Sequence, residues 1–259
     1  MRKSLIVSVV FCIALIAGSA FAGDITKVRI GTEGAYPPFN YVDKNGDLQG
    51  FDVDIAKAIC KAAGVECEFV MQDWDGLIPG LLAKKFDAII ASMSITQERL
   101  KKVDFTNKYY LTPAKFVCKK GVTVEITPEG LKGKTVGVQR GTIHDNFVRD
   151  KFGKTVKIKS YATLDEANMD LISGRIDLVF ADSVALSDGL LKSKEGSNYD
   201  FNGPGFTDKK WFGEGIGIAV RKNSPELVSL LNKAILDIRA NGEYQKVNAK
   251  HFDFDVYGD

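Results

Sequence analysis

Segments typical of strands and helices alternate along the chain, and this alternation limits the fold more than any other feature of the sequence. Alternating strands and helices form α/β folds whose sheets are covered by helices. We therefore expect an α/β protein with mixed, mainly parallel sheets. Apolar strands are expected at 28–31, 66–71, 86–91, 134–139 and 176–181, and helices at 52–63, 75–85 and 163–173.

Turn and cap residues give several of these elements expected ends. Gly64 should end the helix over 52–63, and Pro79 should lie in the first turn of the helix over 75–85. Pro225 marks the first turn of a last helix, which Gly242 should end. Apolar residues at helical spacing predict that one face of this helix packs on the core. They are Leu227, Leu230, Leu231, Ala234, Ile235 and Ile238.

A weak internal repeat indicates two similar units. Residues 81–92 (LLAKKFDAIIAS) and 171–182 (LISGRIDLVFAD) share the residue at their first, seventh and eleventh positions. Each stretch combines the end of a helix with a buried strand, followed by the polar Ser92 or Asp182. Open α/β sheets bind ligands at the carboxyl ends of parallel strands, so the repeat predicts two lobes that face a common cleft. Chance similarity between helix–strand units is the alternative.

The first 22 residues have the three parts of a secretory signal peptide. Basic Arg2 and Lys3 precede an apolar run over 5–17, and the stretch ends in Ala20-Phe21-Ala22. A membrane anchor is the alternative, but thirteen helical residues span about 20 Å, against about 30 Å for a hydrocarbon core. We expect cleavage after Ala22 and an exported product.

Composition and charge exclude several classes of protein. The chain has 259 residues, of which 45% are hydrophobic and 26% charged, as in ordinary globular proteins. Its net charge of +2 falls to zero once the two basic residues of the leader are removed. A neutral chain offers no footprint for nucleic acid. The chain holds only two histidines, and no metal-binding, nucleotide-binding or hydrolase motif is found, so neither a metal nor a cofactor is expected.

The cysteines fit an oxidising compartment. Cys60 and Cys67 flank Gly64 closely enough for a disulfide between a helix end and the next strand. The alternative, a metal site, lacks a second pair of ligands. Cys118, which follows the apolar Phe116 and Val117, is expected to be a buried thiol left without a partner.

Residues after the strand over 86–91 could bind a carboxylate. Ser92, Met93 and Ser94 follow this strand, and Thr96 is a plausible N-cap that would bring Arg99 into the first turn of a helix. An Arg fork, a hydroxyl and helix-end amides together form a carboxylate clamp. The alternative is a surface Arg99 paired with Asp104 or Glu98.

The second lobe offers a similar arrangement. Gly141 would let the backbone approach a ligand, and Thr142 would cap the helix that follows. Asp182 leaves an apolar strand and needs a donor. That donor is either a ligand ammonium or the backbone N–H groups of a helix starting near Val184.

One acid and three aromatic residues could bind a cationic side chain. Glu33, Tyr36, Phe39 and Trp74 would supply charge pairing and cation–π contact. Packing in the core is the alternative for each aromatic residue.

Taken together, these stretches resemble periplasmic solute-binding proteins of the polar amino-acid class, the receptors of ABC-type importers. The resemblance is close to the lysine/arginine/ornithine- and histidine-binding proteins and covers about residues 27–258. It depends on IGTEGAYPPF (30–39), GFDVDIAKAIC (50–60), DGLIPGL (75–81), DAIIASMSIT-QER (87–99), VDFTNKYY (103–110), LKGKTVGVQRGT (131–142), GRIDLVFAD (174–182) and ANGEYQKV…FDFDVYG (240–258).

The resemblance implies a two-lobed type II periplasmic-binding-protein fold that closes around its ligand at a hinge. It also implies roles for single residues. Arg99, Ser94 and Thr142 lie where the family binds the α-carboxylate, and Asp182 and Ser92 lie where it binds the α-ammonium. Glu33 would meet the distal cation, while Tyr36 and Trp74 would pack against the aliphatic stem. Lobe 1 would comprise residues 23–112 and 213–259, and lobe 2 residues 113–212.

Some positions depart from the lysine and histidine binders. Trp74 stands at an aliphatic or Phe position, and Ala91 at a Ser position. Gln139 and His144, which we also expect in the site, are similar to residues of arginine/ornithine and opine receptors. The expected ligand is therefore arginine or ornithine, then lysine or histidine, with an opine as the alternative. An inner-membrane permease is the implied partner, and the protein is expected to be a monomer. The other functions considered are a small-carboxylate dehydratase and a sensor module.

Overall fold

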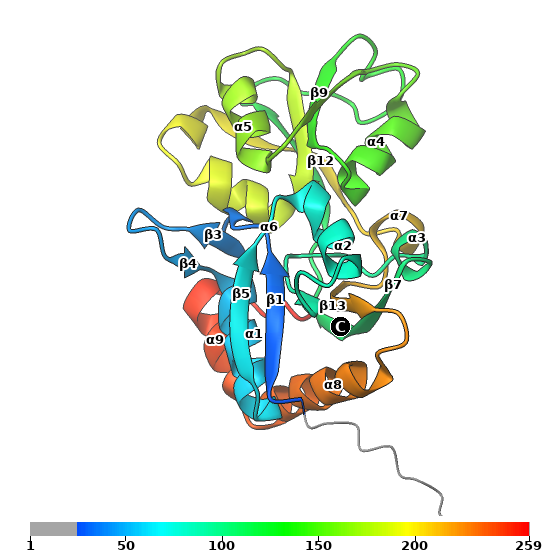
Figure 1. Ribbon diagram of the computed structural model, residues 1–259. Coiled ribbons are helices and arrows are strands. Elements are labelled where there is room, and N and C mark those ends of the chain that lie inside the picture. The colour runs from blue at the N-terminus through cyan, green and yellow to red at the C-terminus, as the bar shows by residue number, and fades with distance from the viewer. Residues whose placement is uncertain (1–24, 259) are drawn as a thin grey trace, which may run out of the picture.

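The computed structural model describes residues 25–258. The expected signal peptide, residues 1–22, and the start of lobe 1 at residue 23 lie outside the described residues. The chain forms two stacked halves, each built on one β-sheet with helices on both faces (Figure 1). No helix within residues 25–258 is long and apolar enough to cross a membrane.

The sheet of the first half combines both ends of the chain. Its order is β5-β1-β6-β13-β7. The strands are β1 (Lys27–Thr32), β5 (Glu66–Met71), β6 (Ala88–Ile89), β7 (Val103–Tyr110) and β13 (Ile216–Arg221). β1 runs parallel to β5 and β6, whereas β13 runs antiparallel to β6 and β7.

The sheet of the second half repeats this arrangement. Its order is β10-β9-β11-β8-β12. The strands are β8 (Ala114–Lys119), β9 (Thr135–Gln139), β10 (Lys157–Tyr161), β11 (Leu178–Asp182) and β12 (Tyr199–Phe206). The two stretches of the internal repeat end in β6 and β11, which are the third strands of their sheets. The repeat therefore marks equivalent positions in two similar units, as predicted.

The sheets are mixed, as expected, but parallel pairs are not the majority. In each sheet two strand pairs are parallel and two are antiparallel. Antiparallel pairs arise where the chain crosses between the halves, because β8 and β13 enter their sheets directly from the connections. A small antiparallel sheet of β2 (Ala35–Tyr36), β3 (Asn40–Val42) and β4 (Leu48–Gln49) adds further antiparallel pairs.

Helices bury apolar side chains on both faces of each sheet. In the first half α1 (Phe51–Ala63), α8 (Pro225–Ala240) and α9 (Glu243–His251) share one core, and α2 (Trp74–Leu82) covers the opposite face. In the second half α4 (Ile143–Phe152) and α5 (Leu164–Ile172) lie on opposite faces. Side chains alternate along a strand, so Leu178 and Phe180 pack with α4 while Val179 and Ala181 pack with α5.

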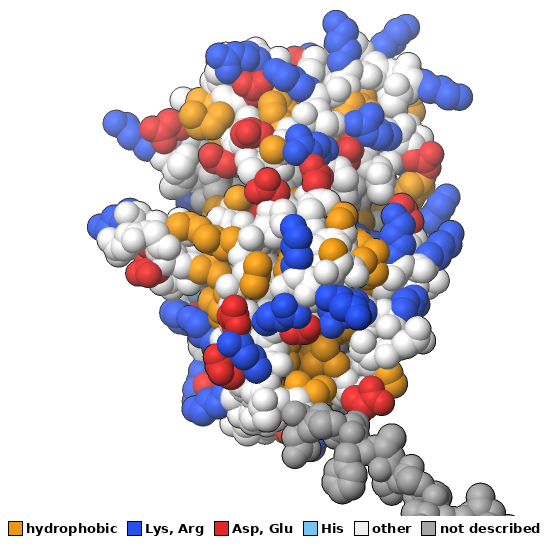
Figure 2. Space-filling model, in the orientation of Figure 1, with side chains coloured by type: hydrophobic (Ala, Val, Ile, Leu, Met, Phe, Trp, Pro, Cys, Tyr) orange, Lys and Arg blue, Asp and Glu red, His pale blue; other side chains and the backbone are white. Residues whose placement is uncertain are grey.

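The remaining elements are short and lie mostly near the junction of the halves. They are α3 (Gln97–Leu100), α6 (Ser183–Leu186), a π-helical turn (Ser187–Leu191), a 3₁₀ turn (Glu195–Asn198) and α7 (Lys209–Phe212). The chain crosses between the halves at residues 111–113 and 207–215 (Figure 1). Figure 2 shows that acidic and basic side chains are interspersed over one face of the molecule.

Most predicted elements are observed, and three of them differ notably from the prediction. Helix α2 stops at Leu82, and Pro79 lies inside it rather than in its first turn. The strand expected over 86–91 is reduced to Ala88–Ile89. Helix α8 ends at Ala240, and Gly242 instead caps α9. The predicted apolar face of α8 is buried except for Leu230, which is half-buried.

The cysteines are arranged as expected. Cys60 near the end of α1 and Cys67 in β5 form a disulfide with a Cα–Cα distance of 6.0 Å. Gly64 ends α1 in the left-handed conformation (φ 70°), which turns the chain back toward the sheet. Cys118 is a free, buried thiol.

Candidate functional site

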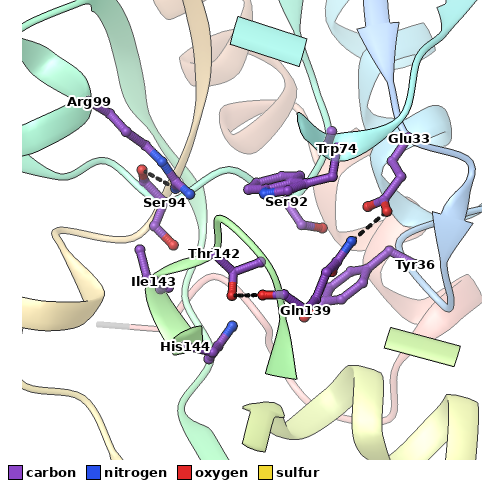
Figure 3. Close-up of a pocket in the computed structure, with 11 residues that line it drawn as sticks. Glu33, Tyr36, Trp74, Ser92, Ser94, Arg99, Gln139, Thr142, Ile143 and His144 are labelled. Atoms are coloured by element: carbon purple, nitrogen blue, oxygen red, sulfur yellow. Dashed lines mark hydrogen bonds between the residues drawn. The ribbon is translucent and has the colours of Figure 1, made fainter. Parts of the chain in front are cut away.

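A pocket lies between the two halves of the molecule (Figure 3). It contains about 310 Å³ of space that no protein atom fills, part of which is open to solvent. The first half contributes Glu33, Tyr36, Trp74, Ala91, Ser92, Ser94 and Arg99, and the second half contributes Gln139, Thr142, Ile143 and His144. Nine of these residues were expected in the site from the sequence.

Arg99 provides an uncompensated cation on one side of the pocket. Thr96 caps α3 by accepting the backbone N–H of Arg99 (3.3 Å), as predicted, and the guanidinium donates to the carbonyl of Ser94 (3.0 Å). Burial lowers the pKa of Arg99 to about 10, which leaves it charged at neutral pH. Within residues 25–258 no carboxylate forms an ion pair with it, and Asp104 pairs instead with Lys222. The alternative of a surface ion pair is therefore wrong.

The start of α4 faces the same pocket from the second half. Thr142 caps this helix, because its hydroxyl accepts the backbone N–H of Asp145 (3.2 Å) and donates to the carbonyl of Gln139 (2.7 Å). The next backbone N–H groups, those of Ile143 and His144, have no acceptor within the helix. Together with Arg99 they form a donor-rich surface suited to an anion.

Glu33 lies on the opposite side of the pocket from Arg99 (Figure 3). Its Oε1 accepts a hydrogen bond of 2.6 Å from Nε2 of Gln139, which also donates to the carbonyl of Ala162. Burial raises the pKa of Glu33 to about 7, against the opposing effect of the Gln139 bond. A cation in the pocket would favour the ionised form of this acid.

Trp74, at the start of α2, forms a wall that joins the two halves. Its ring centroid lies 5.3 Å from the Arg99 guanidinium, and its Nε1 donates to the carbonyl of Gly141 across the cleft (3.2 Å). Beside it, Asp75 forms an ion pair with Arg140 of the second half. These contacts and the Glu33–Gln139 bond hold the halves together, so the structure has a closed cleft.

Asp182 lines a second cavity next to the pocket, and Tyr36, Ser92 and Ser94 are among the residues that border both. Its Oδ1 caps α6 by accepting the backbone N–H groups of Val184 (2.8 Å) and Ala185 (3.0 Å). Its Oδ2 accepts the hydroxyl of Thr112. Asp182 therefore has the capping role that was one of two alternatives, while burial raises its pKa to about 6.

His144 is neutral near pH 7. Its ring lies against Phe180 and Phe212, with centroids 5.6 and 6.2 Å away. Burial, with a smaller effect of the nearby Arg99 charge, lowers its pKa to about 3. The imidazole thus offers the pocket one acceptor or one donor nitrogen without adding charge.

Met93 and Phe39, which the sequence also singled out, line neither the pocket nor the second cavity. Met93 is buried in the core, whereas Ser92 and Ser94 on either side of it line the pocket. Phe39 is also buried and stacks on Tyr110, as its core alternative predicted.

Other residues at the cleft were missed. Ile143 could have been found, since it follows the Thr142 cap directly. The Asp75–Arg140 pair could not, because nothing local links residues 65 positions apart.

In the part of the chain that the structure describes, no group of three or more His, Cys, Asp or Glu side chains is arranged to hold a metal ion.

Two α/β halves that close over a pocket with an acid on one side, and on the other a guanidinium that no described carboxylate pairs, define a binding protein for a small solute. The chain belongs to the bacterial extracellular solute-binding proteins, family 3, whose pattern matches residues 28–254.

Named relatives are similar over nearly their whole length. The L-arginine-binding protein of Pseudomonas aeruginosa is 52% identical over 239 residues, which cover 92% of each chain. The histidine-binding periplasmic protein of Escherichia coli K12 is 44% identical over 99% of each chain. A solved periplasmic binding protein of Salmonella typhimurium, described as highly specific for arginine, superimposes with a TM-score of 0.81 at 36% identity, over 88% of this chain and 99% of its own. These relatives are binding proteins and not enzymes, which agrees with the sequence prediction.

Proposed function

We propose that this protein is a periplasmic receptor that binds a cationic L-amino acid, arginine or ornithine before lysine or histidine, and delivers it to an ABC-type importer. The observation that carries the proposal is the placement of two ionisable groups on opposite sides of one pocket: the Arg99 guanidinium, which no described carboxylate pairs, and the Glu33 carboxyl. A zwitterion with a cationic side chain complements both. The names of the arginine- and histidine-binding relatives support this ligand class.

The ligand's carboxylate would bind the Arg99 guanidinium and the first-turn N–H groups of α4. Ser94 borders this subsite, while Thr142 supports it as the cap of α4. Arg has the planar donor fork that matches a carboxylate, and a helix N-terminus favours negative charge.

The two cationic ends of the ligand would lie near the acids. Asp182 and Ser92 would receive the α-ammonium, and Glu33 the distal guanidinium or ammonium. Tyr36 and Trp74 would pack against the aliphatic stem. Gln139 and His144 add neutral hydrogen-bonding groups to the second half's wall.

Binding would close a hinge between two lobes, of residues 23–112 with 213–259 and of residues 113–212. Each lobe carries part of the polar pocket, so the closed form makes contacts that the open form lacks. The ligand thereby favours the closed form by its differential contact free energy, and an inner-membrane permease would recognise this form. We further propose that residues 1–22 are a cleaved signal peptide and that the mature protein is a monomer.

Calorimetry on protein refolded without ligand tests the proposal. Arginine and ornithine should bind most tightly, lysine and histidine more weakly, and glutamine least, because glutamine leaves the Glu33 charge unpaired. Octopine tests the opine alternative, since its tighter binding would identify an opine receptor. Tight glutamine binding without a response to arginine would refute a cationic ligand. Loss of arginine uptake on gene deletion separates a transport receptor from a sensor.

A further inference from the structure

A buried carboxylate lies directly behind the pocket wall. Asp52, the second residue of α1, has no exposed surface and does not line the pocket. Its Oδ1 accepts the hydroxyl of Tyr109 (2.7 Å), and its Oδ2 accepts Nδ2 of Asn40 (2.8 Å) and the hydroxyl of Ser92 (2.9 Å). Of these three donors, only Ser92 lines the pocket.

These bonds determine the direction of the Ser92 hydroxyl hydrogen. The Asn40 amide has a defined orientation, because its Oδ1 accepts the backbone N–H of Gly34 (2.9 Å) and its Nδ2 must then face Asp52. Burial raises the pKa of Asp52, and the hydrogen bonds from its three donors oppose this shift by favouring the ionised form. The ionised carboxylate accepts hydrogen bonds and cannot donate them. Ser92 therefore donates its only hydroxyl hydrogen to Asp52, and its lone pairs are left to accept from the Tyr110 hydroxyl or from a ligand.

The same carboxylate connects two parts of the pocket wall. Ser92 is held in the left-handed backbone region (φ 54°), which is unusual for a residue with a side chain. Through Asn40, Asp52 is also linked to Gly34, the neighbour of Glu33. Replacing Asp52 would therefore affect the hydroxyl of Ser92 and the loop that carries Glu33.

We propose that Asp52 is a positioning residue that makes Ser92 an obligate hydrogen-bond acceptor, so that this end of the cleft takes only ligand groups that donate hydrogen bonds. The inference rests on the proposed function, since it assumes an amino acid whose α-ammonium lies at Ser92. A carboxylate oxygen there would meet lone pairs. Asp52 thus determines the orientation of the zwitterion in the cleft without touching it.

The test compares L-arginine with 5-guanidinopentanoate, which is arginine without its α-amino group. The ratio of the two affinities, measured by calorimetry, reports the contact made by the α-ammonium. In Asp52→Ala no oxygen remains to accept from Ser92, whose hydroxyl is then free to donate into the pocket. We expect the ratio to fall about 10-fold, the effect of one hydrogen bond to a charged group. A merely structural role would weaken both ligands equally, leave the ratio unchanged and overturn the proposal.

Three further variants make the test specific. Ser92→Gly removes the hydroxyl at a backbone conformation that glycine adopts freely, and should lower the ratio as much as Asp52→Ala. Adding Asp52→Ala to Ser92→Gly should change the ratio no further. Tyr109→Phe removes a donor from the other oxygen of Asp52 and should keep the wild-type ratio. Should Asp52→Ala fail to fold, Ser92→Gly still decides, because a wild-type ratio there refutes the proposal. Wild-type protein that binds no cationic amino acid would refute the proposed function itself.

Discussion

Nε2 of Gln139 lies 2.6 Å from Oε1 of Glu33, although 106 positions separate the two residues in the chain. The bond joins the two halves of the molecule at the wall of the pocket, where burial raises the pKa of Glu33 to about 7. Closure of the cleft and the charge of this acid are therefore linked. A cationic ligand that displaces the Gln139 bond, or adds to it, would bind most tightly when Glu33 is ionised.

Arginine binding should weaken as the pH falls through 7. The ligand cation stabilises ionised Glu33, so its binding should release a proton near pH 6, where free Glu33 is mostly protonated. Affinity should fall by up to about tenfold per pH unit below 7. Calorimetry in buffers of different ionisation enthalpy measures the released proton.

Glu33→Gln is the matched control for this pH effect. It should bind arginine more weakly at pH 8 and remove the proton release that belongs to Glu33. Asp182, with a pKa of about 6, would leave a smaller release at lower pH. In the ligand-free protein, the raised pKa of Glu33 makes folding stability depend on pH in the opposite direction to arginine affinity. The contribution of Glu33 to folding stability is present below pH 4.5 and is lost as the pH rises through 7. An unchanged pH profile in Glu33→Gln would contradict this assignment.

Arg99→Ala should weaken arginine binding at least about 100-fold, because it removes the only charge proposed to meet the α-carboxylate. Arg99→Lys keeps the charge but loses the planar donor fork, and should recover only part of the affinity. Thermal unfolding without ligand checks that both variants fold. Arginine binding by Arg99→Ala at wild-type affinity would remove the basis of the carboxylate clamp.

Asp75→Asn should shift the ligand-free protein toward an open cleft. The Asp75–Arg140 ion pair joins the two halves but lies outside the pocket lining, so its loss changes closure without removing a ligand contact. Since both side chains are substantially exposed, we expect affinity to fall only about two- to fivefold. X-ray scattering without ligand should report a larger radius of gyration. The double variant Asp75→Arg/Arg140→Asp, which exchanges the two charges, should restore both the arginine affinity and the radius of gyration. If it restores neither, the Asp75–Arg140 ion pair does not control closure of the cleft.

Asp182 substitutions should separate a structural role from a binding role. Asp182→Ala removes the cap of α6 and should cost about 1 kcal/mol of stability as well as arginine affinity. Asp182→Asn keeps an oxygen for the backbone N–H groups of Val184 and Ala185 and loses only the charge. Asp182→Asn should fold with near wild-type stability, but its affinity for arginine should be much lower than that of the wild-type protein. Calorimetry and thermal unfolding together measure the difference, and tight binding by Asp182→Asn would refute the ammonium contact.

Removal of the Cys60–Cys67 disulfide should lower stability without changing ligand affinity. The bond closes a loop of seven residues at the end of α1, away from the pocket lining. Loop-closure entropy for so short a loop corresponds to about 2 kcal/mol. Urea unfolding of the Cys60→Ser/Cys67→Ser protein measures this loss, and reduction of the wild-type protein should give the same value. A change in arginine affinity would show that the disulfide also shapes the pocket.

Local sequence signals predicted what depends on neighbouring residues. The periodicity of apolar residues located most helices and strands, the N-caps at Thr96 and Thr142 were correct, and Gly64 ended α1 as expected. These signals work because helix ends and strand burial are decided within a few residues. Nine of the residues lining the pocket were also expected, from strand-end positions and from resemblance to a known family.

The tertiary structure decided everything that requires two distant segments to meet. It determined that Gln139 hydrogen-bonds to Glu33, that Arg140 forms an ion pair with Asp75, and that the hydroxyl of Ser92 hydrogen-bonds to Asp52. It also determined that no carboxylate among the described residues forms an ion pair with Arg99. It also determined that each of the two main sheets has as many antiparallel strand pairs as parallel ones, because the strands that enter from the crossovers run antiparallel to their neighbours. The physical reason is range: periodicity and caps are local, whereas the charge and polarity of a cleft depend on which groups the fold brings within hydrogen-bonding distance.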